Sequence, residues 1–477
     1  MVYHILNIAI FILWWRVLYR RSTVPDLAGQ LIGAFVLTVS QLLLIWQLLG
    51  IAHILNYYSV ATVNLVIALV LLVQGSDWNP RALGHNFCAM QIRRIRAITQ
   101  ELWASTTFSF VFILAVFCMI VVWWFAFRLP NLTYDCWGYH FGRALLMIQE
   151  WHLPPFDWDH RYIDWYPANT DVLMGYAFMG QRNDSWASTV QFWFALGGML
   201  AVYRLLAFPL GVARVTAATI ALTMWSVPTI FHETWSGMVD LASAMSVWMA
   251  WALLGRKVDV WSVTLAGLAM GFGFGTKGSV GYWCVGVFVY LIWRLITDRE
   301  PKKTVLRILL FLTAFLVTGA WWYVSDAIQA PNHNPVYPIT LVVGDKVLFM
   351  GINNSDHRSN VFPFHHVPEQ IHRDLDTRRM WTWWQTTLDP WPGVGLDNKM
   401  GGFGPVWYIV GVPALLTTLI SLCLLRRAGS LVLLLTILIP LFFFPAHGQT
   451  WARFVIPYTL IYPLSIGAMI KELDENA

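Results

Sequence analysis

The chain has 477 residues, of which 57% are hydrophobic and only 12% are charged, against roughly 25% charged residues in an ordinary soluble domain. A soluble core of this length does not need so much apolar surface, so we expect the surplus to face lipid. The formal charge of +5 comes from basic residues spread through short loops, which argues against nucleic acid as a partner. The five cysteines include no C-x-x-C pair, so neither a zinc site nor a disulfide framework is expected.

Apolar runs of about 16–22 residues predict an all-α polytopic membrane protein with about thirteen transmembrane helices. The first run lacks a basic leader and a small-residue cleavage site, so we expect a retained span rather than a signal peptide. In chain order the runs lie at residues 3–19, 29–49, 52–73, 106–127, 186–205, 213–231, 237–255, 260–276, 279–296, 304–325, 405–425, 430–446 and 453–470.

Basic residues occupy alternate connections between these runs, whereas the opposite short connections hold only Lys277 and Arg453. This bias predicts a cytoplasmic C-terminus and an outer N-terminus, in what we expect to be a bacterial inner membrane. The basic connections contain Arg16, Arg20 and Arg21, then Arg81, Arg93, Arg94 and Arg96, then Arg204 and Arg214, then Arg256 and Lys257, then Arg294 to Arg307, then Arg426 and Arg427, and finally Lys471.

Two long polar stretches, 128–185 and 326–404, fall on the predicted outer side and hold most of the acidic residues. Within the first, the apolar segment 166–180 is too short to span upright, and we expect a re-entrant or surface-lying helix there. We divide the chain into an N-terminal three-helix module with a basic loop at 1–105, which is a candidate surface for a membrane partner, a core at 106–325, a lid at 326–404 and the last spans at 405–477.

Asp135 lies in the segment YDCWGYHFGR, residues 134–143, just beyond the outer end of the span at 106–127. The helix-like run that follows, 137–151, has aromatic and apolar residues on one face, so we expect it to lie along the membrane surface. A carboxylate at this boundary can meet a lipid-borne donor and a hydroxyl acceptor from water, and partial desolvation makes it a better general base. The alternative is that Asp135 caps the following helix, and the two roles are compatible.

The pattern Tyr-Asp-x-x-x-Tyr-His-x-x-Arg directly after a span resembles the first outer loop of bacterial GT-C glycosyltransferases, polytopic enzymes that take sugars from polyprenyl-phosphate carriers. Later segments are similar to this family in the same order, and the resemblance covers roughly residues 106–470. These segments are PTIFHETWSGMVD at 228–240, GFGFGTKGS at 271–279, NPVYP at 334–338 and HGQTWARFVIP at 447–457.

The resemblance implies that Asp135 is the catalytic base or orients the acceptor, and that Asp240 is a second catalytic acidic residue. An acidic residue at the edge of a span is costly unless it is paired or hydrated, which independently favours a function for Asp240. Glu233 could join Asp240 around a divalent cation, Mg²⁺ or Mn²⁺. No Asp-x-Asp accompanies Asp240, however, so the cofactor stays open between such a cation and none.

The departing polyprenyl phosphate needs positive charge, and Arg453 at the outer start of the last span is the strongest candidate. Lys277, in a glycine-rich outer turn, is the second; the alternative for Arg453 is contact with lipid headgroups. Arg143 is either a further phosphate contact or a charge on a surface helix. The resemblance also implies contacts to substrate from Tyr139, His140, Glu233, Tyr337 and His447.

We therefore expect an inverting glycosyltransferase whose partners are membrane lipids, a polyprenyl-phosphate-sugar donor and a glycan, lipid or protein acceptor. The His- and Trp-rich stretch 326–404 is expected to form a lid, because loops of this length are usually functional. Two alternatives stay open. A transporter or flippase of lipid-linked sugars would carry charged residues deep in its spans and broken-helix repeats. An O-antigen ligase or polymerase would use residues such as His365 and Arg379 instead of Asp135.

Overall fold

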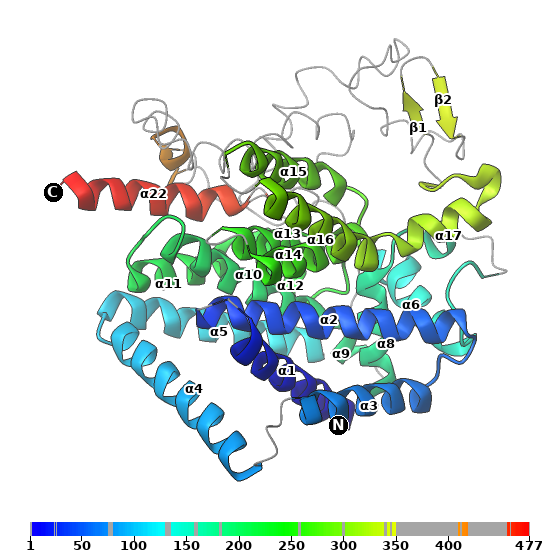
Figure 1. Ribbon diagram of the computed structural model, residues 1–477, viewed down its shortest axis with the longest axis horizontal. Coiled ribbons are helices and arrows are strands. Elements are labelled where there is room, and N and C mark those ends of the chain that lie inside the picture. The colour runs from blue at the N-terminus through cyan, green and yellow to red at the C-terminus, as the bar shows by residue number, and fades with distance from the viewer. Residues whose placement is uncertain are drawn as a thin grey trace.

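The structure is a computed structural model, and its helices pack side by side around one hydrophobic core (Figure 1). It describes residues 2–22, 24, 26–74, 80–128, 135–156, 161–180, 184–255, 259–297, 301–337, 341–343, 346–349, 409–410, 413–417, 456–457 and 459–476. The elements are α1 (Val2–Arg21), α2 (Leu27–Ile51), α3 (Tyr57–Gln74), α4 (Pro80–Trp103), α5 (Thr106–Arg128), η1 (Cys136–His140), α6 (Phe141–Gln149), α7 (Arg161–Asp164), α8 (Asn169–Gly180), α9 (Ser185–Ser188), α10 (Val190–Ala207), α11 (Arg214–Thr223), η2 (Met224–Ser226), α12 (Pro228–Thr234), α13 (Asp240–Leu254), α14 (Val260–Phe274), α15 (Val280–Thr297), α16 (Pro301–Gly319), α17 (Trp321–Gln329), η3 (Pro331–His333), β1 (Leu341–Val343), β2 (Lys346–Phe349) and α22 (Ile461–Asn476).

Three of the described helices are long and apolar enough to cross a membrane: α2, α5 and the stretch Ser185–Ala207. Two further helix pairs pass this test only when the two helices are taken together. The pair of α11–η2 and α12 is bent by 74°, and the pair of α16 and α17 is bent by 60°. If each bent pair is one span, the described residues contain up to five candidate spans. The first bend falls at Pro228, which has no backbone N–H to continue a helix. The predicted count of about thirteen is therefore not confirmed, and α13, α14 and α15 are shorter apolar helices.

The apolar side chains of α5 face outward over most of the helix. Only 17% of its most apolar stretch is buried, against 72% for α2, which runs through the interior. Phe110, Phe117 and Ile120 are each more than 60% exposed. An exposed apolar surface of this kind suits contact with lipid, and it is consistent with a membrane-spanning protein.

The first three helices share the hydrophobic core with the rest of the chain rather than standing apart from it. A buried chain of hydrogen bonds leads from Gln41 of α2 to Oδ1 of Asn64 on α3 (2.9 Å), and from Nδ2 of Asn64 to the hydroxyl of Tyr176 on α8 (2.8 Å). Trp46 of α2 packs against Tyr176, with ring centroids 5.2 Å apart. The N-terminal helices thus brace α8, which carries part of the site described below.

One local expectation is wrong. The basic connection at 81–96, predicted as a loop, is part of the helix α4, where Arg, Ala and Gln favour helix. The segment 166–180 contains α8, which is buried within the protein from Asn169 to Phe178, and the expectation of a re-entrant or surface-lying helix stays a prediction.

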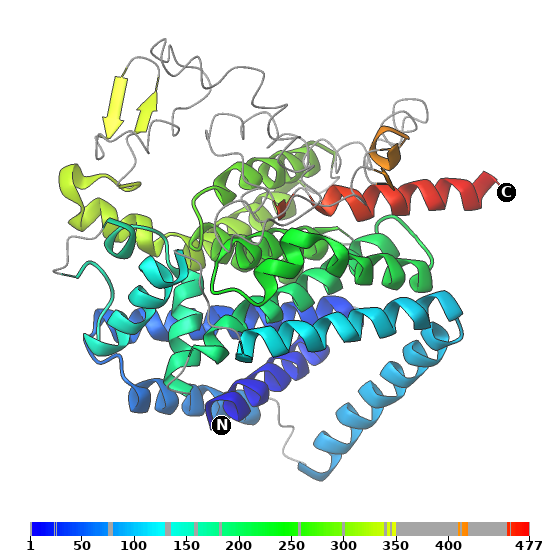
Figure 2. The same ribbon diagram turned by 180° about the vertical axis from the view of Figure 1, so that it is seen from behind.

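Helices α6, α8 and α17 lie at one end of the bundle and the C-terminal end of α22 at the opposite end, in both views (Figures 1 and 2). The strands β1 and β2 form an antiparallel hairpin beyond α17, so the segment predicted as an outer lid departs locally from the all-α class. The described parts of the two long polar stretches are therefore gathered at the same end.

Candidate functional site

The first turn of α8 is fastened to three neighbouring helices by Asn169. Its Nδ2 donates hydrogen bonds to the carbonyl oxygens of Phe272 (3.1 Å) and Thr318 (2.7 Å). Its Oδ1 accepts a hydrogen bond from the indole nitrogen of Trp322 at 2.7 Å. Gly275 leaves room for this amide, since a Cβ at that position would lie 2.3 Å from Nδ2 of Asn169. The start of α8 is therefore fixed against α14, α16 and α17.

Two residues further along α8, Asp171 binds two side chains of the predicted motif. Nδ1 of His140 lies 2.8 Å from Oδ1 of Asp171, and Nε of Arg143 donates to Oδ2 at 2.6 Å. The guanidinium of Arg143 also donates to the carbonyl oxygens of Tyr166 (2.6 Å) and Pro167 (3.3 Å). Asp171 and Arg143 are 0% exposed and His140 is 4% exposed. An ionised carboxylate only accepts, so it orients His140 with Nδ1 as the donor and Nε2 as the nitrogen that can take a proton.

The alternative of a surface-helix charge for Arg143 is wrong, because its side chain is fully buried and paired. Most of its N–H donors are used within the protein, so it braces the site more readily than it grips a phosphate. The run predicted as one surface-lying helix is η1 followed by α6, and its inner face packs on α8.

A second ion pair joins the other two motif segments, between Nζ of Lys277 and a carboxylate oxygen of Asp240. Asp240 lies in the first turn of α13, where the helix dipole favours negative charge. Gln191 fixes this turn, because its amide donates to the carbonyl oxygen of Met238 and its Oε1 accepts from the amide of Ala242 at 2.7 Å. The Lys277 side chain is 24% exposed, so the pair is reachable from outside the fold.

The two ion pairs belong to one continuous site. The hydroxyl groups of Thr170 and Thr276, the neighbours of Asp171 and Lys277, are hydrogen-bonded at 3.0 Å. On the other side, a Cβ at Gly237 would lie 2.4 Å from the ring of Phe141 and 2.5 Å from the sulfur of Cys136. The absence of a side chain at Gly237 thus lets the loop before Asp240 lie directly on the segment after Asp135.

Asp135 immediately precedes η1 and is partly buried. Its side chain makes no capping hydrogen bond, so the alternative of a helix cap is not supported. Four residues after Asp135 in the same motif, the ring of Tyr139 packs against that of His140, with centroids 4.2 Å apart. Asp135 is therefore placed at the start of the motif without being used to cap the helix.

The ring of Tyr337 packs against that of Trp165, with centroids 5.5 Å apart. Trp165 directly precedes Tyr166, whose carbonyl oxygen accepts a hydrogen bond from Arg143. Glu233 of α12 is 1% exposed.

Within the part of the chain that the structure describes, no group of three or more His, Cys, Asp or Glu side chains is arranged to hold a metal ion. Arg453, His447 and residues 351–404 lie outside the described residues, so their predicted roles stay predictions.

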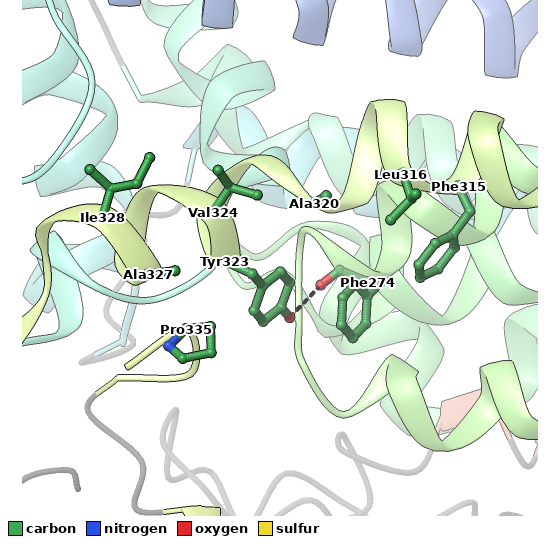
Figure 3. A pocket seen from close by; sticks show the side chains of 9 residues that line it. All are labelled: Phe274, Phe315, Leu316, Ala320, Tyr323, Val324, Ala327, Ile328 and Pro335. Carbon is green, nitrogen blue, oxygen red and sulfur yellow. Dashed lines mark hydrogen bonds between the residues drawn. The ribbon is translucent and has the colours of Figure 1, made fainter. Parts of the chain in front are cut away.

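An apolar hollow of about 460 Å³ lies beside the glycine-rich turn, at the bend between α16 and α17 (Figure 3). Its wall includes Tyr323, whose hydroxyl donates a hydrogen bond to the carbonyl oxygen of Phe274 at 3.0 Å. A Cβ at Gly278, next to Lys277, would lie 3.3 Å from that hydroxyl. The full lining is Phe274, Phe315, Leu316, Ala320, Tyr323, Val324, Ala327, Ile328 and Pro335.

Sequence reasoning missed Asn169 and treated Asp171 only as one of several outer acidic residues. The signal was the polar triplet Asn-Thr-Asp at the start of an apolar segment, because polar groups within apolar helices are costly and are usually paired. It also missed Asp326, which is 5% exposed and lies within electrostatic reach of Arg143.

No protein-family model, no curated protein and no solved structure matches this chain.

Proposed function

We propose that this protein is a membrane glycosyltransferase that moves a sugar from a polyprenyl-phosphate carrier to an acceptor hydroxyl. The observation that carries the proposal is the convergence of four family-like segments at one end of the bundle. Cys136 meets Gly237, Asp240 pairs with Lys277, and Tyr337 packs on Trp165 beside the residues that hold Arg143. The segments that resembled the family only in their order are thus also neighbours in space.

In the proposed reaction Asp135 takes the proton of the acceptor hydroxyl as its oxygen attacks the anomeric carbon with inversion. The bond between that carbon and the phosphate oxygen breaks, and the phosphate leaves with the electron pair. Lys277, and Arg453 of the last segment, stabilise the leaving phosphate, which is the kind of preorganised electrostatics that usually contributes most to the rate. The apolar hollow, whose Tyr323 hydroxyl lies close to Gly278 in the turn that carries Lys277, suits the first isoprene units of the carrier.

The test is to compare surface glycans by mass spectrometry in cells with and without this chain, and then in cells that carry Asp135→Asn. We expect the glycan to disappear with the gene and to stay absent with D135N. The matched control is Asp259→Asn at the start of α14, where Asn still accepts the capping hydrogen bond from Ser262. Normal glycans with well-expressed D135N would overturn the assignment and favour a flippase or a ligase of lipid-linked sugars.

A further inference from the structure

Helix α4 is mostly exposed over residues 87–103, where only Phe87 and Gln91 are buried. Its N-terminal end projects from the bundle, and its C-terminal end meets the start of α5 (Figures 1 and 2). Its 24 residues contain four arginines and one acidic residue, Glu101. A long helix that is basic and mostly exposed needs a partner of opposite charge or a fully hydrated surface.

One side of α4 packs on α1. The ring of Phe87 lies 5.4 Å from those of both Trp15 and Tyr19, and the hydroxyl of Tyr19 lies 3.1 Å from the sulfur of Met90. At the far end Trp103 packs on Phe108 and Phe112 of α5. These contacts fix the helix in place and leave its other side uncovered.

The uncovered side carries apolar residues at helical spacing, with arginines beside them. Cys88, Ile92 and Ile95 follow one another at intervals of four and three residues, so they share a face. Ile92 is 63% exposed and Ile95 is 43% exposed. Arg93 and Arg96 are exposed beside this face. Exposed Ile alternating with Arg is the pattern of helices that lie in a membrane surface.

We propose that α4 lies in the headgroup layer of the membrane and binds anionic phospholipid. Ile92 and Ile95 enter the upper acyl region, and the guanidinium groups of Arg93 and Arg96 bind lipid phosphates, which Arg can grip bidentately. A lipid partner follows from the position of α4 next to α5. Trp103 at the end of α4 packs on α5, which is the least buried of the three candidate spans. Neither a soluble protein nor a second copy of the chain is required by this arrangement, and the proposal does not depend on the glycosyltransferase function.

The native thiol of Cys88 is exposed and lies on the proposed lipid face, so it is the site for a fluorescent probe. The full chain, with Cys118 and Cys423 replaced by Ala, is labelled and placed in nanodiscs of phosphatidylcholine or of an equal mixture with phosphatidylglycerol. Quenching by spin-labelled lipid reports contact with the bilayer, and quenching by iodide reports contact with water. The test variant is Arg93→Gln with Arg96→Gln, and the matched control with the same loss of charge is Lys302→Gln with Lys303→Gln.

We expect lipid quenching to be at least about twofold stronger in anionic than in neutral discs, since each basic residue near an anionic surface contributes about a fivefold preference. The arginine variant should lose this difference and the lysine variant should keep it. Equal iodide quenching in both lipids, as expected for a helix that is hydrated or covered by protein, would overturn the proposal. So would a lipid contact that the arginine variant leaves unchanged.

Discussion

Arg143 and Asp171 form an ion pair in which neither side chain is exposed, with Nε 2.6 Å from Oδ2. The pair joins α6 to α8, and the same carboxylate orients His140. It therefore couples the stability of this end of the bundle to the geometry of the candidate site.

Removing the carboxylate should be severely destabilising. Asp171→Ala leaves Arg143 as a buried charge without its counter-ion, and breaking a buried pair costs about 3–5 kcal/mol. The free energy of unfolding, measured by titration with SDS in mixed micelles, should fall by that amount. Glu150→Ala, at the exposed end of α6, should change it by less than about 0.5 kcal/mol. Equal effects of the two substitutions would show that the pair is not formed.

The hydrogen bond between Asn64 and Tyr176 gives a smaller and independent test. Tyr176→Phe removes the hydroxyl that lies 2.8 Å from Nδ2 of Asn64, and the free energy of unfolding should fall by about 1 kcal/mol. Tyr58→Phe is the matched change on α3, where the side chain is 79% exposed and no loss is expected. If the two variants have the same free energy of unfolding, the hydrogen bond between Asn64 and Tyr176 does not hold α8 against the N-terminal helices.

Gly271 permits the close approach of α14 and α16, because a Cβ there would lie 2.2 Å from the carbonyl oxygen of Phe315. Gly271→Ala should therefore destabilise the protein by about 1–3 kcal/mol despite the better helix propensity of Ala. At Gly142 of α6 the nearest atom to a Cβ is 3.6 Å away, so Gly142→Ala should be neutral or stabilising. In thermal unfolding followed by circular dichroism, the melting temperature of G271A should fall, and that of G142A should stay the same or rise. Equal melting temperatures of the two variants would contradict the close approach at Gly271.

Lys277→Met should lower both stability and transfer. Asp240, which is 3% exposed, loses its counter-ion. Lys277 also belongs to the turn in which Gly278 approaches the hydroxyl of Tyr323 in the wall of the hollow. Transfer is therefore measured per folded enzyme. In a reconstituted assay, Lys277→Met should lower kcat/KM for the lipid-linked donor by about 100-fold or more, the usual cost of removing one electrostatic contact to a developing charge. Lys302→Met, an exposed lysine on α16, is the control and should be near normal. An unchanged kcat/KM in K277M would remove Lys277 from the donor site.

The broad character of the chain could be predicted from the sequence, because a long apolar run has few ways to exist other than in lipid or in a core. The runs at 29–49 and 106–127 correspond to α2 and α5, which are candidate spans. The runs at 213–231 and 304–325 look uniform in hydropathy, yet both are bent. The first is bent at Pro228, and the second between Gly319 and Trp321. Hydropathy does not register such bends, and it does not separate a span from a short buried helix such as α13.

The site could be predicted only where a residue type carried a functional signal of its own. Asp240 and Lys277 were both singled out, but their mutual ion pair depends on how α13 and α14 pack. Asp171 and Asn169 were missed because their importance lies in their partners, which are distant in sequence: Thr318 follows Asn169 by 149 residues. A single sequence contains no record of such long-range pairing.

The bend before α17 gives that helix two unlike sides. Trp322 and Asp326, one turn apart, belong to the side that meets α8 and Arg143, whereas Tyr323, Val324 and Ala327 line the apolar hollow. Changes on one side need not disturb the other. If the proposed reaction holds, substitutions in the hollow alone would alter which lipid tails the protein accepts.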